Sequence, residues 1–388
     1  MRAIVVGGGI GGLATAAALV RGGWDVEVLE RADRFELVGS GISLWANGFT
    51  ALDVLGIGDR LRAAGRFDGP AGLRDHRGRW LLRASDTMRA RTKDLVGVVH
   101  RAELLDALLS VVPRECLRSG ADVRAVRQDG RHVIVEHTGG TSQADVVIGA
   151  DGLHSAVRAA VWPDAPKPRY TGQTAWRFVL PRPSGVADEG GEIWCRDGVF
   201  GFFPMTGDRI YAYTTANTPA GGDRDADQLA RWREHCVGWP EPAGTLLATA
   251  REQDVLRHDL HYLPALRTYV DGRVALLGDA AHAMPPYLGQ GGNQALEDAV
   301  TLAALLAGVL VDGVPGALRE YDRIRRPRAQ AIARQSIGVG RLNHLRNPVA
   351  TRVRNALIRR VPESLATRSY ASVVSWRPPA AAANLSAP

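Results

Sequence analysis

A glycine cluster near the start of the chain, Gly7-Gly8-Gly9-Ile10-Gly11-Gly12, limits the possible folds more than any other feature. It follows the apolar run 3–6, which is typical of a central parallel strand, and a helix is predicted from inside the cluster to about Gly22-Gly23. The next apolar run, 25–29, ends in Glu30, 18 residues after Gly12. That spacing suits a carboxylate on an adenosine ribose, so the pattern predicts a Rossmann-like unit that binds a dinucleotide.

Glu30 also bears on which dinucleotide fits this unit. A carboxylate there accepts hydrogen bonds from ribose hydroxyls and repels a 2′-phosphate, so NADP is disfavoured in this cleft. The adjacent Arg31 is a further candidate for a cofactor contact. Because only one complete glycine fingerprint occurs in the chain, a second Rossmann domain for NAD(P)H is not expected.

A second glycine-rich segment lies at residues 278–299. The apolar run 274–277 indicates a buried strand that ends at Asp279, and a loop with glycines at 289, 291 and 292 follows. We expect Asn293 to be the N-cap of a helix from about Gln294 to Leu310. The free N–H groups of that helix start form a predicted anion site, and the glycines let backbone approach a ligand closely. The predicted contacts of this segment are Asp279, Gly289, Gly291, Gly292 and Asn293.

A third segment, 144–158, again reads as a strand, a turn and a helix, with Asp151 at the turn. Taken alone, it fits an ordinary strand-to-helix turn in which the aspartate is a cap. Its order in the chain together with the first two motifs favours a ligand-binding role for Asp151.

These motifs together resemble the FAD-dependent aromatic monooxygenases of the p-hydroxybenzoate hydroxylase family, with its urate and salicylate hydroxylase-like members. The resemblance implies that FAD is bound by Gly7, Gly9, Gly11, Gly12, Glu30 and the second and third motifs. It also implies that Ser43, in a flavin-lining turn at 41–43, Arg101 and the turn before Val123 contact the cofactor. NADH or NADPH would reduce FAD, and a flavin C4a-hydroperoxide would transfer one oxygen atom from O₂ to an electron-rich ring.

The expected fold class is α/β, with a Rossmann-like FAD-binding domain built on a parallel sheet, a mostly antiparallel substrate domain and C-terminal helices. The predicted FAD domain is discontinuous, at 1–70, 95–165 and 265–330. Segments with period-two alternation, such as 172–179 and 209–214, place the substrate domain at 71–94 and 166–264. A helical segment at 331–388 is expected to end in a disordered tail from Arg377.

A base or cation near the substrate ring would help to activate a phenol for oxygen transfer. The candidates are Arg177, Arg209, Tyr211 and Tyr213, and Arg209 occupies the place of a substrate-binding arginine in urate-hydroxylase-like members. Pro286, Trp194, Phe202 and Leu288 are candidates for an apolar lining that excludes water. Ordinary core packing explains each of these four apolar residues equally well.

The net charge of +7 and the 46 arginines raise the question of nucleic-acid or membrane partners. We expect no nucleic-acid partner, because no aromatic and basic residues interleave and arginine replaces lysine along the whole chain. Val353, Leu357 and Val361 recur at four-residue spacing in a basic helical segment, which predicts packing against the flavin domain. Peripheral membrane contact is the alternative.

No segment is long and apolar enough to span a bilayer, and the three cysteines form no CxxC pair. A cytoplasmic enzyme without a metal, working as a monomer or homodimer on a small aromatic substrate and O₂, is therefore expected. Two alternatives remain. One is a flavin-dependent reductase, dehydrogenase or epoxidase on the same scaffold, and the other is a non-enzymatic basic binding module.

Overall fold

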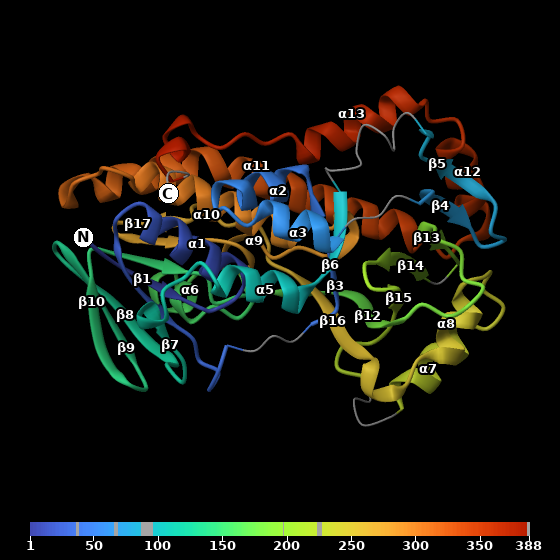
Figure 1. Cartoon of the computed structure of the whole chain (residues 1–388), viewed down its shortest axis with the longest axis horizontal. Coiled ribbons are helices and arrows are strands. Elements are labelled where there is room, and N and C mark those ends of the chain that lie inside the picture. The colour runs from blue at the N-terminus through green and yellow to red at the C-terminus, as the bar shows by residue number, and fades with distance from the viewer. Residues whose placement is uncertain (36–38, 66–68, 87–95, 197, 223–226, 386–388) are drawn as a thin grey trace.

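The structure, a computed structural model, describes residues 1–35, 39–65, 69–86, 96–196, 198–222 and 227–385, and Figure 1 shows their arrangement. A parallel sheet and a larger antiparallel sheet lie along the longest axis, with long C-terminal helices over one side. The predicted α/β class is confirmed.

The first sheet has six strands in the order β17-β18-β11-β1-β2-β7, and all neighbours are parallel except β17 and β18. Its central strand is β1, where Ala3, Ile4 and Val5 are fully buried, as a strand covered on both faces requires. The strands of this sheet are β1 (Arg2–Val6), β2 (Asp25–Leu29), β7 (Leu117–Arg118), β11 (Val146–Gly149), β17 (Val270–Asp271) and β18 (Val274–Leu276).

The helix α1 (Ile10–Arg21) begins inside the glycine cluster and ends at Gly22, as predicted. Its alanine-rich surface is buried, and it packs against α10 (Gly291–Leu306), so the two glycine-rich motifs lie side by side. The other helices of this unit are α2 (Ala46–Val54), α3 (Gly58–Gly65), α5 (Arg101–Leu109), α6 (Ala156–Val161) and α9 (Asp279–His282). Two small sheets complete it, β3 (Gly41–Trp45) with β6 (Val96–His100), and β8 (Val123–Asp129), β9 (His132–His137) and β10 (Gly140–Ala144).

The second sheet has seven strands in the order β16-β12-β15-β14-β13-β4-β5, and only β13 and β4 pair in parallel. The predicted alternation is present in β15, where Ile210 and Ala212 enter a core with Trp232 while Tyr211 and Tyr213 face the other way. The elements are β4 (Ala71–Asp75), β5 (Trp80–Arg83), β12 (Arg169–Pro181), β13 (Gly190–Trp194), β14 (Gly198–Met205), β15 (Arg209–Asn217), β16 (Leu256–Tyr262), α7 (Gln228–His235) and α8 (Ala243–Thr249).

The early excursion of the chain does join this second sheet, through β4 and β5. Residues 87–94 of that predicted segment lie outside the described residues. Farther along, the predicted boundary at residue 330 falls inside α11 (Val314–Asn343), a continuous helix that runs along both units in Figure 1.

The C-terminal segment differs from two expectations. In α12 (Pro348–Ile358) the buried residues are Thr351, Arg354 and Asn355, whereas Val353 and Leu357 are exposed, so the predicted apolar packing against the flavin domain is wrong. This helix contacts β5 of the second sheet instead. It is followed by α13 (Glu363–Val374), which lies along the top of the molecule in Figure 1.

The expected disorder of the tail is also wrong for most of its length. A 3₁₀ segment at Ala380–Leu385 packs against α10, and Leu385 is fully buried. The carbonyl of Leu385 accepts a hydrogen bond from Arg21 at 3.2 Å. Ala382 is also buried and Ala381 partly so, which gives the segment an apolar contact that its composition alone did not indicate. Residues 386–388 lie outside the described residues.

Candidate functional site

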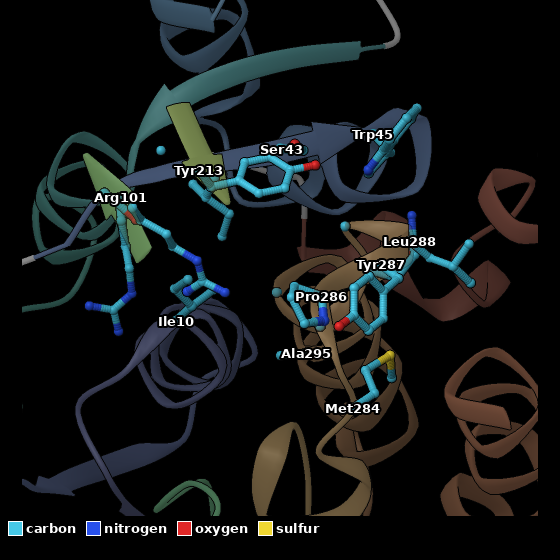
Figure 2. Close-up of a pocket in the computed structure, with 18 of the residues that line it drawn as sticks. Ile10, Ser43, Trp45, Arg101, Tyr213, Met284, Pro286, Tyr287, Leu288 and Ala295 are labelled. Atoms are coloured by element: carbon cyan, nitrogen blue, oxygen red, sulfur yellow. The ribbon is translucent and has the colours of Figure 1, made fainter. Parts of the chain in front are cut away.

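A cavity of about 790 Å³ lies between the two units. Its lining comes from the glycine turn before α1, from β3, from β12 to β15 and from the loop before α10. Figure 2 shows Ile10 and Arg101 on one side of this space, Tyr213 above it, and Pro286 and Tyr287 facing it from the opposite loop. The volume is within the range of small-molecule and cofactor sites.

The glycine turn leaves bare backbone along one end of the cavity. Gly7 has a φ of +106°, and a Cβ there would lie 2.5 Å from the carbonyl oxygen of Ala150. A Cβ on Gly12 would lie 1.9 Å from the carbonyl oxygen of Gly7, so α1 packs closely on the turn. Gly9 lines the cavity with no atom within 4 Å of the position of a Cβ. This arrangement fits a pyrophosphate at the start of a helix.

Glu30 holds the same turn in place. Its carboxylate accepts hydrogen bonds from the N–H of Gly8 at 2.6 Å and from the N–H of Ala32 at 2.9 Å. The adjacent Arg31 is exposed and does not line the cavity. Glu30 follows the last residue of β2 and fixes the backbone of the glycine turn, but it does not itself line the cavity, so its predicted contact with a ribose stays a prediction.

The second glycine motif forms the opposite wall, but its helix begins earlier than expected. Gln290 is the N-cap of α10, and Asn293 lies inside the first turn, so the predicted N-cap role of Asn293 is wrong. Its buried amide instead accepts from the N–H of Trp45 at 3.0 Å and donates to the carbonyls of Ser43 and Gly289. The helix ends at Leu306 rather than Leu310. Asn293 thus joins β3 to the start of α10.

Three glycines shape this wall. Gly289 has a φ of +60°, Gly292 approaches Ile42, and Gly291 has open space where a Cβ would be. All three line the cavity, together with Ser43. Residues 41–43 form strand β3, not the turn that was expected, because they pair with β6.

Asp279 and Arg101 both line the cavity. Desolvation in this enclosed space raises the pKa of Asp279, and the positive charge of Arg101 opposes that rise. Asp151 lies beside the cavity wall formed by Ala150 and Gly152, and its carboxylate accepts from the N–H of Val157 at 3.0 Å. The N-cap of α6 is Ser155, so Asp151 is not the cap itself, although it binds an N–H of the first turn; burial raises the pKa of Asp151.

A buried ionic network fixes the loop that carries Asp279. Asp298 accepts from the N–H of Gly278 at 3.0 Å and from Arg325 at 2.7 Å, and its Oδ2 lies 2.6 Å from Nε2 of His282. Burial alone would raise the pKa of Asp298, but His282 and Arg325 lower it to about 2. Arg325 also pairs with Glu297. As expected, His282 supports the loop.

On the substrate side, a carboxyl and a phenol face the cavity together. The hydroxyl of Tyr213 donates to Glu192, and Nε1 of Trp194 donates to the same carboxylate at 2.8 Å. Desolvation raises the pKa of Glu192 and raises that of Tyr213 well above its usual value. Arg177 lines the same cavity, and its charge opposes the rise for Tyr213.

Tyr211 and Pro286 also line the cavity, as predicted for residues near a substrate. The rings of Tyr211 and Tyr213 are 5.6 Å apart, and Gly41 lies so close to Tyr211 that a Cβ would be 2.3 Å from the ring. Leu288 lines the cavity too, whereas Phe202 is buried in the core of the second sheet. Trp194 reaches the site only through its bond to Glu192.

Arg209 does not reach the cavity. It shares a face of β15 with Tyr211 and Tyr213, but it is the first residue of the strand, and its guanidinium pairs with Glu103 at 2.7 Å. Its predicted place beside the substrate is therefore not supported. Val123 is likewise not among the lining residues; it begins β8 and is buried in the core of the first unit, while the turn before it bonds to the carbonyl of Glu30 through the N–H of Ala121 at 2.8 Å.

Sequence reasoning missed Glu192 and the ionic network of α10. A glutamate inside the otherwise apolar strand β13 was the available signal for the first. The ionic network consists of Glu297, Asp298 and Arg325, which occur at fully buried positions of their helices. Charged residues seldom occupy such positions unless they are paired.

Comparisons with known proteins agree with this geometry. A family model described as an FAD binding domain matches residues 1–336. The aurachin C monooxygenase/isomerase of Stigmatella aurantiaca is 36% identical over 362 residues, covering 92% of this chain and 93% of that protein. The chain belongs to the FAD-dependent aromatic monooxygenases of the p-hydroxybenzoate hydroxylase family.

Two further comparisons support the assignment of the chain to this family. The 2-heptyl-3-hydroxy-4(1H)-quinolone synthase of Pseudomonas aeruginosa is 32% identical over 375 residues, covering 95% of this chain and 97% of that protein. The solved structure of Klebsiella pneumoniae HpxO with FAD and uric acid has a TM-score of 0.88 and 30% identity, covering 96% of each chain.

This monooxygenase uses FAD with NADH or NADPH as co-substrate, and it hydroxylates an aromatic or heteroaromatic small molecule. The bare backbone at Gly9 and Gly291 fits the cofactor, since both glycines face open space from opposite helix starts. None of the helices in the described ranges has the length and apolar character needed to cross a bilayer.

Proposed function

We propose that this monooxygenase hydroxylates a heteroaromatic ring that carries an acidic N–H or O–H, and that Tyr213 and Glu192 take up that proton. The single observation that carries the proposal is the hydrogen bond from Tyr213 to Glu192 in the wall of the cavity. Two relatives support the ring class, since one is a quinolone synthase and another was solved with uric acid.

The two side chains have complementary properties for this task. Tyr213 keeps its proton near neutral pH because its pKa is raised, so it is a poor base by itself. Glu192 has a pKa raised above the ordinary glutamate value, which makes its carboxylate a better proton acceptor than one in water. Trp194 fixes the orientation of that carboxylate.

The proton transfer follows from this order of groups. The substrate N–H or O–H gives its proton to the oxygen of Tyr213 while the proton of Tyr213 moves to Glu192. The ring becomes anionic and richer in electrons, and Glu192 becomes neutral. Arg177, which lines the same cavity, stabilises the negative charge on the ring.

Bound FAD supplies the activation of O₂ and the delivery of one oxygen atom. The residues of the chain orient it and exclude water. The turn at Gly9 would hold the pyrophosphate, and the start of α10 at Gly291 and Gly292, where a helix dipole favours negative charge, would hold the anionic part of the reduced flavin. Pro286 and Leu288 cover the reacting side with apolar surface.

A pair of variants tests the proton-transfer role. Tyr213→Phe and Glu192→Gln are expected to lower product formation about 100-fold on a panel of urate, quinolones and phenols. Both should retain wild-type FAD content, because neither residue lies at the glycine turn or at the start of α10. Tyr170→Phe is the matched control, since its hydroxyl binds the carbonyl of Thr218 and does not line the cavity.

The pH profile separates this role from a purely structural one. Because Glu192 must be ionised to accept the proton, the wild-type rate should fall as pH drops through its raised pKa. That acid limb should be absent from Glu192→Gln. Unchanged turnover and an unchanged acid limb in both variants would refute the role of this pair. Product without incorporated oxygen would instead favour a reductase.

We also propose a cellular location, an oligomeric state and a division into domains. We place the enzyme in the cytoplasm, as a monomer or homodimer without a nucleic-acid partner. We further propose the FAD domain at 1–70, 95–165 and 265–330, and the substrate domain at 71–94 and 166–264. The two sheets support this division, because their strands come from these separate segments.

A further inference from the structure

A row of apolar side chains is exposed along the C-terminal helices. Val349, Val353 and Leu357 of α12 are 65%, 54% and 60% exposed and are spaced four residues apart. Val361 and Leu365 continue the row at 36% and 55%. Val361 lies in the turn after α12 and Leu365 at the start of α13, and these five residues make up half of the exposed large hydrophobic side chains in the described ranges. We call them the apolar row.

The opposite face of α12 is fixed to the enzyme by polar residues. Arg354 is buried and donates to the carbonyl of Leu342 at 3.0 Å, and its guanidinium lies 4.9 Å from the ring centre of Trp194. Trp194 in turn binds Glu192 in the cavity wall. The helix is therefore held with its apolar row outward by contacts on its other side.

The basic charge of the chain is concentrated in its C-terminal part, which includes this row. Residues 323–388 contain 13 arginines and a single acidic residue, a net charge of +12, while residues 1–322 carry −5. Arg352 and Arg360 are exposed beside the row, with no ion pair to any described residue. A compositional preference for arginine explains the choice over lysine, but not this uneven distribution.

The helix that carries the last residue of the apolar row also reaches the substrate cavity. The row ends on α13, and the last residues of that helix, Val373 and Val374, line the cavity. Figure 1 shows α13 running back from the α12 end of the molecule over the long helix α11. One helix thus joins the exposed surface to the reaction site.

We propose that the apolar row and its arginines dock this enzyme on an anionic lipid surface. Interfacial helices combine these two features, with apolar side chains in the acyl boundary and cationic ones at anionic headgroups. A nucleic acid would match the charge but leave the row of valines and leucines in water. A second copy of this surface would bring two strongly positive patches together. The proposal does not depend on the substrate or on the Tyr213 and Glu192 pair.

Vesicle flotation with the FAD-loaded full chain tests the proposal. We compare vesicles of phosphatidylcholine alone with vesicles that also contain phosphatidylglycerol. The wild type should bind the anionic vesicles at least tenfold more strongly, and the binding should weaken between about 50 and 300 mM salt. Arg352→Gln with Arg360→Gln should reduce the binding at least tenfold, since each arginine contributes about 1 kcal/mol. Val353→Ser with Leu357→Ser should reduce it on both kinds of vesicle.

The control is Val237→Ser with Arg251→Gln, an exposed valine and an exposed arginine near α7 and α8, and this variant should bind like the wild type. FAD content and melting temperature should be unchanged in all three double variants. Absent or salt-insensitive vesicle binding would overturn the proposal, as would equal binding by wild type and variants. Binding of duplex DNA in place of vesicles, or a dimer that the Leu357 variant abolishes, would overturn it in favour of another partner.

Discussion

The Nε2 atom of His282 lies 2.6 Å from Oδ2 of Asp298, and the same oxygen accepts the N–H of Gly278 at 3.0 Å. This buried contact ties the loop that carries Asp279 to the middle of α10. The two parts of the second glycine motif, the segment at Gly278 to His282 and the helix α10, are therefore joined directly. Arg325 completes the arrangement from α11 with a bond of 2.7 Å to the other oxygen of Asp298.

Loss of the charge on Asp298 should destabilise the protein. Asp298→Asn leaves Arg325 with one carboxylate partner fewer in a fully buried site, and we expect a loss of about 3 kcal/mol in the free energy of unfolding. Urea unfolding measures it. Glu320→Gln, which breaks an exposed pair with Arg323, should lower the free energy of unfolding far less. Equal losses in the two variants would contradict the role of the buried network.

The same carboxylate predicts an acid dependence of stability. Its pKa is about 2 in the folded protein, below the ordinary value of about 3.9 for an unfolded chain. A group with a lowered folded pKa stabilises the protein above its unfolded pKa, and this contribution is lost as pH falls through the folded value. The stability difference between wild type and Asp298→Asn should therefore shrink between about pH 4 and pH 2. A difference that stays constant over this range would refute the assignment.

Two glycines of the first motif should respond differently to a methyl group. Gly12→Ala places a Cβ 1.9 Å from the carbonyl oxygen of Gly7, so both melting temperature and FAD content should fall. Gly9→Ala meets no protein atom within 4 Å, so the apoprotein should keep its melting temperature while FAD affinity falls. Titration of the apoprotein with FAD measures the second effect. If Gly9→Ala binds FAD with wild-type affinity, the proposal that this turn binds the cofactor is wrong.

The two arginines proposed from sequence are now distinguishable. Arg177→Met should lower kcat/KM about tenfold, because Arg177 lines the cavity, and a tenfold change corresponds to about 1.4 kcal/mol. Arg209→Met should change kcat/KM by less than about twofold, since Arg209 pairs with Glu103 outside the cavity. Steady-state kinetics on the best substrate of the panel provide both values. The reverse order would restore the sequence-based prediction for Arg209.

The sequence predicted the flavin-binding frame well because its motifs are local. The strand, the turn at Gly7 to Gly12 and the helix α1 follow one another within about twenty residues. Because Gly12 packs closely on Gly7, only glycine fits there, and the motif can be recognised from the sequence. The strands of the second sheet were visible for a similar reason, since period-two alternation depends only on neighbouring positions.

The errors arose where a residue's role depends on distant partners. Asn293 had the residue type of an N-cap, but it binds Trp45 and Ser43, about 250 positions earlier in the chain. Arg209 was on the right face of β15 and too near its end. Glu192 became a candidate only when β13 and β15 were seen to place it against Tyr213. In α12 the buried arginine reversed the face that hydrophobic spacing had suggested.

Turnover under isotopically labelled dioxygen tests the central claim most directly. The purified protein should carry FAD, consume NADH or NADPH, and form a hydroxylated ring product that contains one labelled oxygen atom. The same reaction in labelled water with ordinary dioxygen should give unlabelled product. A protein that stays colourless after incubation with FAD, or a product whose new oxygen comes from water, would contradict the account.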